Sequence, residues 1–297
     1  LKDAVRSVAK GTICDHEIVV VDGGSTDGTV DWLQAQGDRL TPVYQGKLLG
    51  TARAYNDVWR EIDCTYTCWL SDDTEITAGA LDTAISLLEK HPAIGMVGLK
   101  MRDVEGPFTD VEYMGAVSEH GILNCNHGVV RMPLLKQLGY FNEAYRSYTI
   151  DPDLTASVLS SGHNVVMTRS ISVLHHRTWF EHEGEGRVQQ MKAGIDNEQI
   201  YRDKFAYLGS RYKSGALNKI WRQLVYRFRP IFFPNGAQRF GLSGRDAHNL
   251  LTARFMSLRS DNEIPEAHLV QRIPKKLLHD RANPYLELVL RRHTSEF

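Results

Sequence analysis

Two adjacent carboxylates, Asp72 and Asp73, stand directly after an aromatic and apolar run at residues 66–70. Such a run is typical of a buried strand, so the pair lies where a strand ends and a loop begins. In open α/β sheets, ligands bind beyond the carboxyl ends of the strands. Carboxylate oxygens at such a point suit a divalent cation and the phosphates it carries. The structural alternative is an aspartate that only caps the helix expected to begin near Ala78.

A second polar turn follows a β-branched run at residues 17–22, which is typical of a central parallel strand. Asp22 ends this run, and the two glycines after it let the backbone approach a ligand closely. Ser25, Thr26 or Asp27 can cap the helix that follows, and free N–H groups at a helix start attract anions. The turn lacks the dinucleotide fingerprint and the P-loop ending, which excludes these two classes of nucleotide site. A plain strand-to-helix turn is the structural alternative.

The elements that would position these residues alternate between strand and helix along the N-terminal part of the chain. By periodicity we expect strands at residues 17–22, 42–44, 66–70 and 94–100, with helices at 1–10, 51–62 and 78–90. Such alternation predicts an α/β fold with a mostly parallel sheet and helices on both faces. Residues 103–126 break the pattern and suggest loops or an antiparallel insertion. Beyond them we expect strands at 128–131, 165–167 and 171–174 and helices at 133–138 and 154–161.

Size and composition are typical of a globular protein. With 297 residues the chain can bury a large core in one or two domains, and 42% hydrophobic residues is an ordinary share. Four cysteines in or beside apolar runs favour reduced thiols and a cytoplasmic protein, and Cys64 and Cys68 lack the spacing of a zinc site. Neither a signal peptide nor a run of about 18 apolar residues is visible, so we expect no membrane span.

Charge is unevenly distributed, although the formal net charge is only -1. Residues 205–297 carry 16 Lys and Arg against 7 Asp and Glu, whereas residues 1–204 carry 19 against 29. An acidic body with a basic tail predicts a metal-binding part beside a segment that meets anionic surfaces, and we expect no nucleic-acid partner. Residues 220–233 mix apolar side chains with arginines, so this stretch either lies on the inner face of a membrane or packs on the main domain. Residues 248–258 are another expected helix, and residues 259–297 carry no readable function.

Several motifs, taken in order, resemble those of the family 2 glycosyltransferases of GT-A fold. Six segments carry the resemblance: the strand-to-loop motif at 17–29, the helix motif at 50–56, the Asp-x-Asp region at 70–73, the Gly-x-Phe-Asp-Glu segment at 139–143, the acceptor-side motif at 151–154 and a histidine after the final strand, His175. The resemblance implies a GT-A catalytic domain over residues 1–180, with the family's first strand preceding Leu1. Residues 181–297 would form a largely helical C-terminal extension.

The resemblance also implies the chemistry. The family transfers a sugar from a nucleotide-sugar donor to a hydroxyl of a glycan or lipid-linked acceptor, usually with inversion and a Mg or Mn ion. The donor nucleotide would be bound by five residues: Asp22, Ser25, Asp27, Arg53 and Asp72. Asp73 and His175 would hold the metal, with His176 as a substitute for His175. Asp151 would be the general base for the acceptor hydroxyl, with Asp153 as the alternative.

The chain departs from the family pattern at three positions. Ser71 stands where the first Asp of Asp-x-Asp is expected, Gly23 where many uridine-nucleotide users have a second Asp, and Ile150 where a Glu precedes the proposed base. Two other functions therefore stay open. One is a nucleotidyltransferase, which also places paired aspartates on an α/β sheet. The other is a degenerate module that binds a sugar nucleotide without transfer, although such a module has no need of clustered carboxylates.

Overall fold

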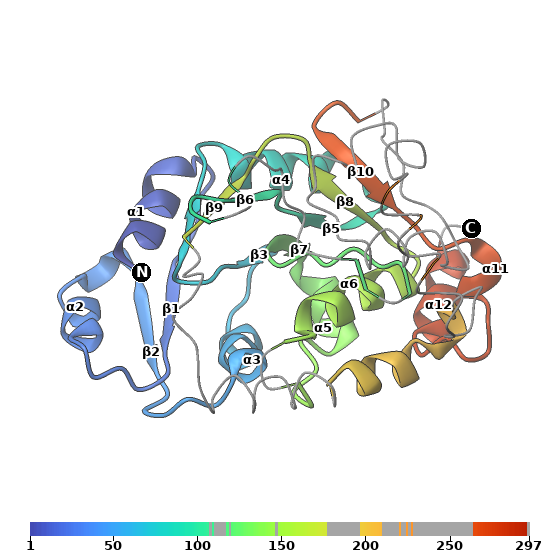
Figure 1. Ribbon diagram of the computed structural model, residues 1–297, viewed down its shortest axis with the longest axis horizontal. Helices are drawn as coiled ribbons and strands as arrows, with labels where there is room; N and C mark the ends of the chain where they lie inside the picture. Colours follow the sequence, from blue (N-terminus) through green and yellow to red (C-terminus); the bar gives the residue numbers. More distant parts are fainter. Residues whose placement is uncertain are drawn as a thin grey trace.

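The computed structural model describes residues 1–106, 109, 117, 118, 120–145, 148–176, 197–209, 220, 224, 227 and 264–295. Within these residues the chain is a mixed α/β structure, with three β-sheets and helices packed around them (Figure 1). No helix in these ranges is both long and apolar enough to cross a membrane.

The largest sheet has five strands in the order β10–β8–β5–β7–β3 among the described residues. These strands are β3 (Tyr66–Trp69), β5 (Ile94–Gly98), β7 (Gly128–Arg131), β8 (Asn164–Thr168) and β10 (Ala267–Gln271). β5 and β8 are parallel, whereas β3–β7, β7–β5 and β8–β10 are antiparallel. β5 lies at the centre and is buried along its whole length, as its apolar sequence predicts.

Two smaller sheets lie beside the large one. In the first, β1 (Val19–Asp22) pairs in parallel with β2 (Thr41–Tyr44). In the second, β9 (Val173–His175) lies between β4 (Thr74–Ile76) and β6 (Met101–Asp103), antiparallel to β4 and parallel to β6. This three-stranded sheet matters for the site, because β9 carries His175 and β4 begins directly after Asp73.

Helices cover both faces of the five-stranded sheet. α4 (Ala80–Lys90) packs on one face, and α5 (Met132–Leu138) and α6 (Ile150–Ser160) pack on the other (Figure 1). The other helices are α1 (Lys2–Gly11), α2 (Thr29–Gln34), α3 (Thr51–Glu61), α11 (Lys275–Leu278) and α12 (Leu286–Ser295), with the 3₁₀ turns η1 (Gly37–Arg39) and η2 (Ala206–Leu208). Residues 197–204 are also helical.

Alternation along the strands divides the core in two. On β5, Met96 belongs to the core under α5 and α6, whereas its neighbour Val97 belongs to the core under α4. Val165 and Val166 on β8 divide in the same way. Successive side chains of a strand point to opposite faces of the sheet, so each apolar run supplies both cores.

The expected α/β class is confirmed, and so are the main helices. The helices predicted at 1–10, 51–62, 78–90 and 133–138 are α1, α3, α4 and α5. The pairing is mixed where the sequence predicted a mostly parallel sheet, since three of the described strand pairs are parallel and four antiparallel. The antiparallel pairs include both pairs made by β7, which lies between β3 and β5, and an antiparallel pair needs no crossover helix.

Some described residues beyond 180 share the sheet and the core with the residues before it. β10 is an edge strand on β8, and Leu277, Leu278 and Val289 join the core beside α6. The division at residue 180 stays a prediction. Of the amphipathic stretch 220–233 only residues 220, 224 and 227 are described, and the helix expected at 248–258 lies outside the described residues.

Candidate active site

The aspartate pair lies in the short turn between β3 and β4. Ser71 Oγ donates a hydrogen bond to Asp73 Oδ1 at 2.5 Å, and Thr74 Oγ1 donates to the Ser71 carbonyl at 2.7 Å. Asp72 is exposed, and the Asp73 side chain keeps 42% of its surface accessible. Both carboxylates can therefore be reached from solvent, as binding of a charged ligand requires.

His175 meets Asp73 from the middle strand of the three-stranded sheet. His175 Nε2 lies 3.2 Å from Asp73 Oδ2, and His175 Nδ1 lies 2.9 Å from Asp103 Oδ1. The strand register produces this arrangement, because His175 pairs with Thr74 on β4 and with Asp103 on β6. The side chains become more exposed in the order Asp103, His175, Asp73, at 1%, 13% and 42%. The row therefore leads from the interior to the surface.

Hydrogen bonds keep Asp73 ionised. Burial alone would raise its pKa, but hydrogen bonds from His175 and Ser71 outweigh burial and lower the pKa of Asp73 to about 2. Burial lowers the pKa of His175, but its hydrogen bonds to the carboxylates of Asp73 and Asp103 outweigh burial, and the pKa is raised. The turn therefore presents a fixed negative charge next to an imidazole.

These residues suit a divalent cation that a phosphate group of the substrate also binds. Asp73 offers a carboxylate oxygen and His175 a ring nitrogen, and Asp103 lies behind the ring as carboxylates do behind metal-binding histidines. Within the described ranges no group of three or more His, Cys, Asp or Glu is arranged to hold a metal ion. The protein would thus supply few of the ligands itself, as in Mg²⁺ sites that substrate phosphates and water complete.

Asp151 lies at the start of α6, partly exposed. Removal of its carboxylate from water raises its pKa to about 8, and a hydrogen bond from Trp69 offsets only part of that effect. Thr149, the residue that caps α6, has φ of +79°, a strained conformation for a β-branched residue. Such strain next to a carboxylate with a raised pKa is typical of functional sites.

Tyr55 links Asp151 to the aspartate pair. Its hydroxyl donates to the Leu70 carbonyl at 2.6 Å, one residue before the turn. Burial and then the nearby carboxylates of Asp151, Asp72 and Asp73 raise the pKa of Tyr55. Tyr55 therefore lies within electrostatic reach of all three carboxylates. Its hydrogen bond to Leu70 joins α3 to the end of β3.

Asp153 points elsewhere. Residues two positions apart on a helix lie on different faces, and Asp153 is buried where it accepts hydrogen bonds from Tyr145 Oη at 2.8 Å and Lys204 Nζ at 2.6 Å. A carboxylate that is fully engaged in this way is poorly placed to take a proton from an acceptor. The helix was also expected to begin at residue 154, but α6 begins at Ile150, since Pro152 is compatible with the first turn of a helix.

The proposed nucleotide-binding residues of the first turn shape their own loop. Asp22 accepts the N–H groups of Gly24 and Ser25 at 2.9 and 3.1 Å, and a hydrogen bond from the Ser25 side chain is the main cause that lowers the pKa of Asp22. Asp27 accepts the Thr29 N–H at 3.1 Å at the start of α2. Gly24 has φ of +97°, and a Cβ there would lie 2.8 Å from the Gly46 backbone, so only glycine fits.

Arg53 lies on α3 beside a cavity. Its guanidinium pairs with Asp57 at 2.5 Å and with Glu143 at 3.5 Å. The cavity has a volume of about 440 Å³ and is lined by Lys47, Leu49, Arg53, Glu143 and Tyr145. The loop that carries Lys47 also contacts the loop after Asp22, since the Gly24 position is packed against Gly46 and Lys47. The cavity beside Arg53 and the turn after Asp22 therefore share one neighbour, the loop that carries Gly46 and Lys47.

Sequence reasoning missed two residues of the site, Asp103 and His127. His127 is buried, with Nδ1 3.2 Å from the Trp69 carbonyl and Nε2 3.4 Å from Ser71 Oγ. Burial lowers its pKa to about 4. No local pattern marks His127. For Asp103 a signal existed, since it lies two residues after Met101, at a position where a strand would point inward.

Comparison with known proteins gives a family and a fold. Residues 1–148 match the model of Glycosyl transferase family 2, and a search of curated protein sequences found no match. The structure is similar to S. aureus TarS, with a TM-score of 0.53 and 16% identity over 80% of this chain and 42% of that chain. It is also similar to GalNAc-T7 with UDP, GalNAc and Mn²⁺, with a TM-score of 0.55 and 11% identity over 80% of this chain and 54% of that chain. This chain thus spans about half the length of these structures, and at such identities the likeness shows the fold alone.

Proposed function

We propose that this chain, which belongs to the family 2 glycosyltransferases and has the GT-A fold predicted from its sequence, transfers a sugar from a nucleotide-sugar donor to a hydroxyl group. One observation carries the proposal: His175 meets Asp73 at 3.2 Å in the turn after β3, and Tyr55, which donates to the Leu70 carbonyl just before that turn, has its pKa raised by burial and by the charge of Asp151. The site therefore offers a place for a phosphate-bound cation and a separate carboxylate that can take a proton.

Asp151 is the proposed general base. A base works best when its pKa lies near the working pH, and burial raises the pKa of Asp151 to about 8. As the acceptor oxygen attacks the anomeric carbon, its proton passes to the Asp151 carboxylate and the new glycosidic bond forms. The bond from the anomeric carbon to the diphosphate breaks, and its electron pair leaves with the nucleoside diphosphate. A single displacement of this kind inverts the anomeric centre, by the logic used for glycosidases.

Asp73 and His175 are the proposed ligands of a Mn²⁺ or Mg²⁺ ion. When bound, such an ion stabilises the charge that develops on the leaving diphosphate. The pairing of Asp73 with His175 and the low pKa of Asp73 support this role. The similar GalNAc-T7 structure contains UDP and Mn²⁺. Asp72 would bind the donor ribose, and Asp22 with Ser25, Asp27 and Arg53 would bind the rest of the nucleotide.

The acceptor is proposed to be a glycan or a lipid-linked saccharide at the cytoplasmic face of a membrane. Residues 264–295 carry six Lys and Arg against three Asp and Glu, and five of the six basic side chains are exposed. Basic surfaces of this kind are attracted to anionic lipids. This surface supports peripheral contact with a membrane that holds the acceptor.

The decisive experiment is a thermal-shift screen of UDP, dTDP, GDP and CDP, each with and without Mn²⁺. A ligand that binds only the native state stabilises it by mass action, by about 2.7 kcal/mol at 100 times its Kd. We expect one diphosphate to raise Tm, and only with Mn²⁺. Asp73→Asn should abolish this shift, whereas Asp82→Asn on α4 should keep it.

Two other outcomes would count against the proposal. If no nucleoside diphosphate changes Tm with either Mn²⁺ or Mg²⁺, the assignment of the donor site is wrong. If a diphosphate binds but the matching nucleotide sugar is never consumed with any acceptor, the chain is a binding module without transfer activity.

A further inference from the structure

Asp103 is a charged residue at an inward position of a strand. Along β6, Met101 and Asp103 are buried whereas Arg102 between them is exposed. The alternation of a strand therefore predicts an apolar residue at 103. The Asp103 carboxylate is instead only 1% exposed. Burying a charge is unfavourable unless the charge is paired, so the position calls for an explanation.

The described residues give this carboxylate one partner, the ring of His175. Oδ1 lies 2.9 Å from His175 Nδ1, while Oδ2 is buried and has no hydrogen-bond partner within the described residues. The strands do not need this side chain in order to pair. Their backbones already pair in register, and Val104 N–H donates to the His175 carbonyl at 2.9 Å. The carboxylate is therefore directed at the imidazole.

The hydrogen bond decides which ring nitrogen faces the surface. An ionised carboxylate only accepts hydrogen bonds, so Nδ1 of His175 must carry a proton to bond Asp103. Nε2 is then the nitrogen that faces Asp73, at 3.2 Å from Oδ2. Metal-binding histidines are commonly oriented in this way by a carboxylate behind the ring.

We propose that Asp103 is a positioning residue, which holds His175 with Nδ1 protonated and Nε2 directed at the cation site beside Asp73. The inference rests on the proposed function, because it assigns the cation to Asp73 and His175. Asp103 itself does not contact the cation. It acts through His175, and its loss should weaken cation binding without removing either ligand.

The test is the affinity for Mn²⁺ alone, measured by electron paramagnetic resonance of the free ion. Asp103→Asn should weaken Mn²⁺ binding by about 10- to 100-fold, the effect seen for outer partners of metal ligands. Asp82→Asn is the matched control, since Asp82 also accepts hydrogen bonds, from the Ile13 and Cys14 N–H groups, and lies on α4. It should leave Mn²⁺ affinity unchanged. Equal affinity of Asp103→Asn and wild type would overturn the inference.

A double-mutant cycle separates positioning from a general effect of charge. In a His175→Gln background, Asp103→Asn should cause no further loss of Mn²⁺ affinity, because the ring it orients is gone. An equal loss in both backgrounds would show that Asp103 acts by its charge and would overturn the inference. If the wild-type protein bound Mn²⁺ neither alone nor with any of the four nucleoside diphosphates, this would instead contradict the proposed function.

Nitrogen-15 NMR covers the case in which Asp103→Asn does not fold. In the wild-type protein with Mg²⁺ bound, the His175 ring nitrogens report which one carries the proton. A proton on Nδ1 supports the inference, and a proton on Nε2 overturns it.

Discussion

Asp73 and Asp151, the proposed metal ligand and the proposed base, are carboxylates whose surroundings push their pKa values apart. Hydrogen bonds from His175 and Ser71 bring the pKa of Asp73 to about 2, and burial brings that of Asp151 to about 8. Two carboxyl groups whose pKa values differ in this way can have different chemical roles. Asp73 stays an anion and suits a cation, whereas Asp151 can exchange a proton near neutral pH.

The first prediction concerns the rate of transfer. Because Asp151 must be ionised to accept a proton, the rate should rise with pH and level off above about 8, the pKa given to it by burial. Asp151→Asn should lower the rate by about 100-fold or more and remove this pH dependence, while the affinity for the nucleoside diphosphate stays the same. Rate measurements across pH and calorimetry test both parts. A comparable loss in Asp153→Asn, with its fold intact, would mean that the base is misassigned.

The second prediction concerns stability. The pKa of Asp151 is raised to about 8 in the folded state, against about 3.9 in an unfolded chain. Between these values the folded state binds more protons, so this group lowers stability as pH rises through the window. Asp151→Asn removes the charged form, and it should raise Tm more at about pH 9 than at about pH 4. Thermal denaturation at both pH values tests this. An equal change in Tm at the two pH values would refute the raised pKa of Asp151.

At the scale of elements, α6 carries the proposed base and a structural carboxylate on different faces. Asp151 is partly exposed, while Asp153 is buried and holds Lys204 at 2.6 Å, at the end of the helical residues 197–204. Lys204 also lies over the rings of Phe205 and Tyr285, at 5.0 and 5.6 Å from their centroids. Segments beyond residue 180 thus support the helix from behind, and the site depends on them indirectly.

The third prediction follows from this buried pair. Among the described residues, Lys204→Met leaves the buried Asp153 charge with the Tyr145 and Ser157 hydroxyls as side-chain partners, and it should lower the free energy of unfolding by about 3–5 kcal/mol. The matched control is Lys90→Met, since Lys90 pairs with Glu266 at 3.8 Å on the surface. That exposed pair should be worth at most about 1 kcal/mol. Urea unfolding measures the loss of stability in both variants. Equal losses would show that the buried pair of Asp153 and Lys204 stabilises the fold no more than the exposed pair does.

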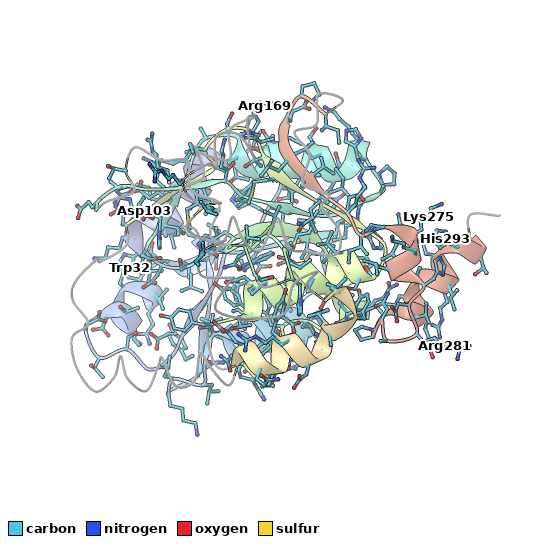
Figure 2. The ribbon with its side chains drawn as sticks, turned by 45° about the vertical axis from the view of Figure 1, so that its right-hand side comes forward. Trp32, Asp103, Arg169, Lys275, Arg281 and His293 are labelled. Carbon is cyan, nitrogen blue, oxygen red and sulfur yellow. The ribbon has the colours of Figure 1, made fainter. Side chains whose placement is uncertain are left out.

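At the scale of the whole molecule, the basic side chains on α11, on α12 and between them lie at one end of the described structure. Figure 1 shows α11 and α12 at the end opposite α1 and α2. Lys275, Arg281 and His293 lie together at that end (Figure 2). The acidic excess of residues 1–204 lies in the rest of the chain. This separation of charge would orient the molecule towards an anionic surface.

The fourth prediction is binding to anionic vesicles. Each basic residue near such a surface contributes about 1 kcal/mol, and salt screens the attraction. Reversal of Lys275, Lys276 and Arg281 to Glu should therefore weaken co-sedimentation with phosphatidylglycerol vesicles, and the remaining binding should depend less on salt. Reversal of Lys2, Lys10 and Arg39, at the opposite end, is the control and should have a smaller effect. Equal loss from both triple variants would mean that net charge alone governs binding.

The sequence by itself determined the α/β class, the main helices and the position of Asp72 and Asp73 at the end of a strand. These features depend on periodicity and turn chemistry, which act over a few residues and can be read locally. The resemblance to the family 2 glycosyltransferases singled out Asp151, although not its separation from Asp153, because α6 begins four residues before the expected start at residue 154.

Only the tertiary structure decided which side chains meet. His175 lies 102 residues from Asp73 and 72 from Asp103 along the chain, yet it touches both. Their contact follows from the register of β9 between β4 and β6, and the antiparallel return of β7 brings His127 next to Ser71. Register between remote strands is set by packing and backbone hydrogen bonds over the whole fold. No local pattern around His127 contains it, and the inward position of Asp103 on its strand does not name His175 as its partner, so both contacts became visible only in three dimensions.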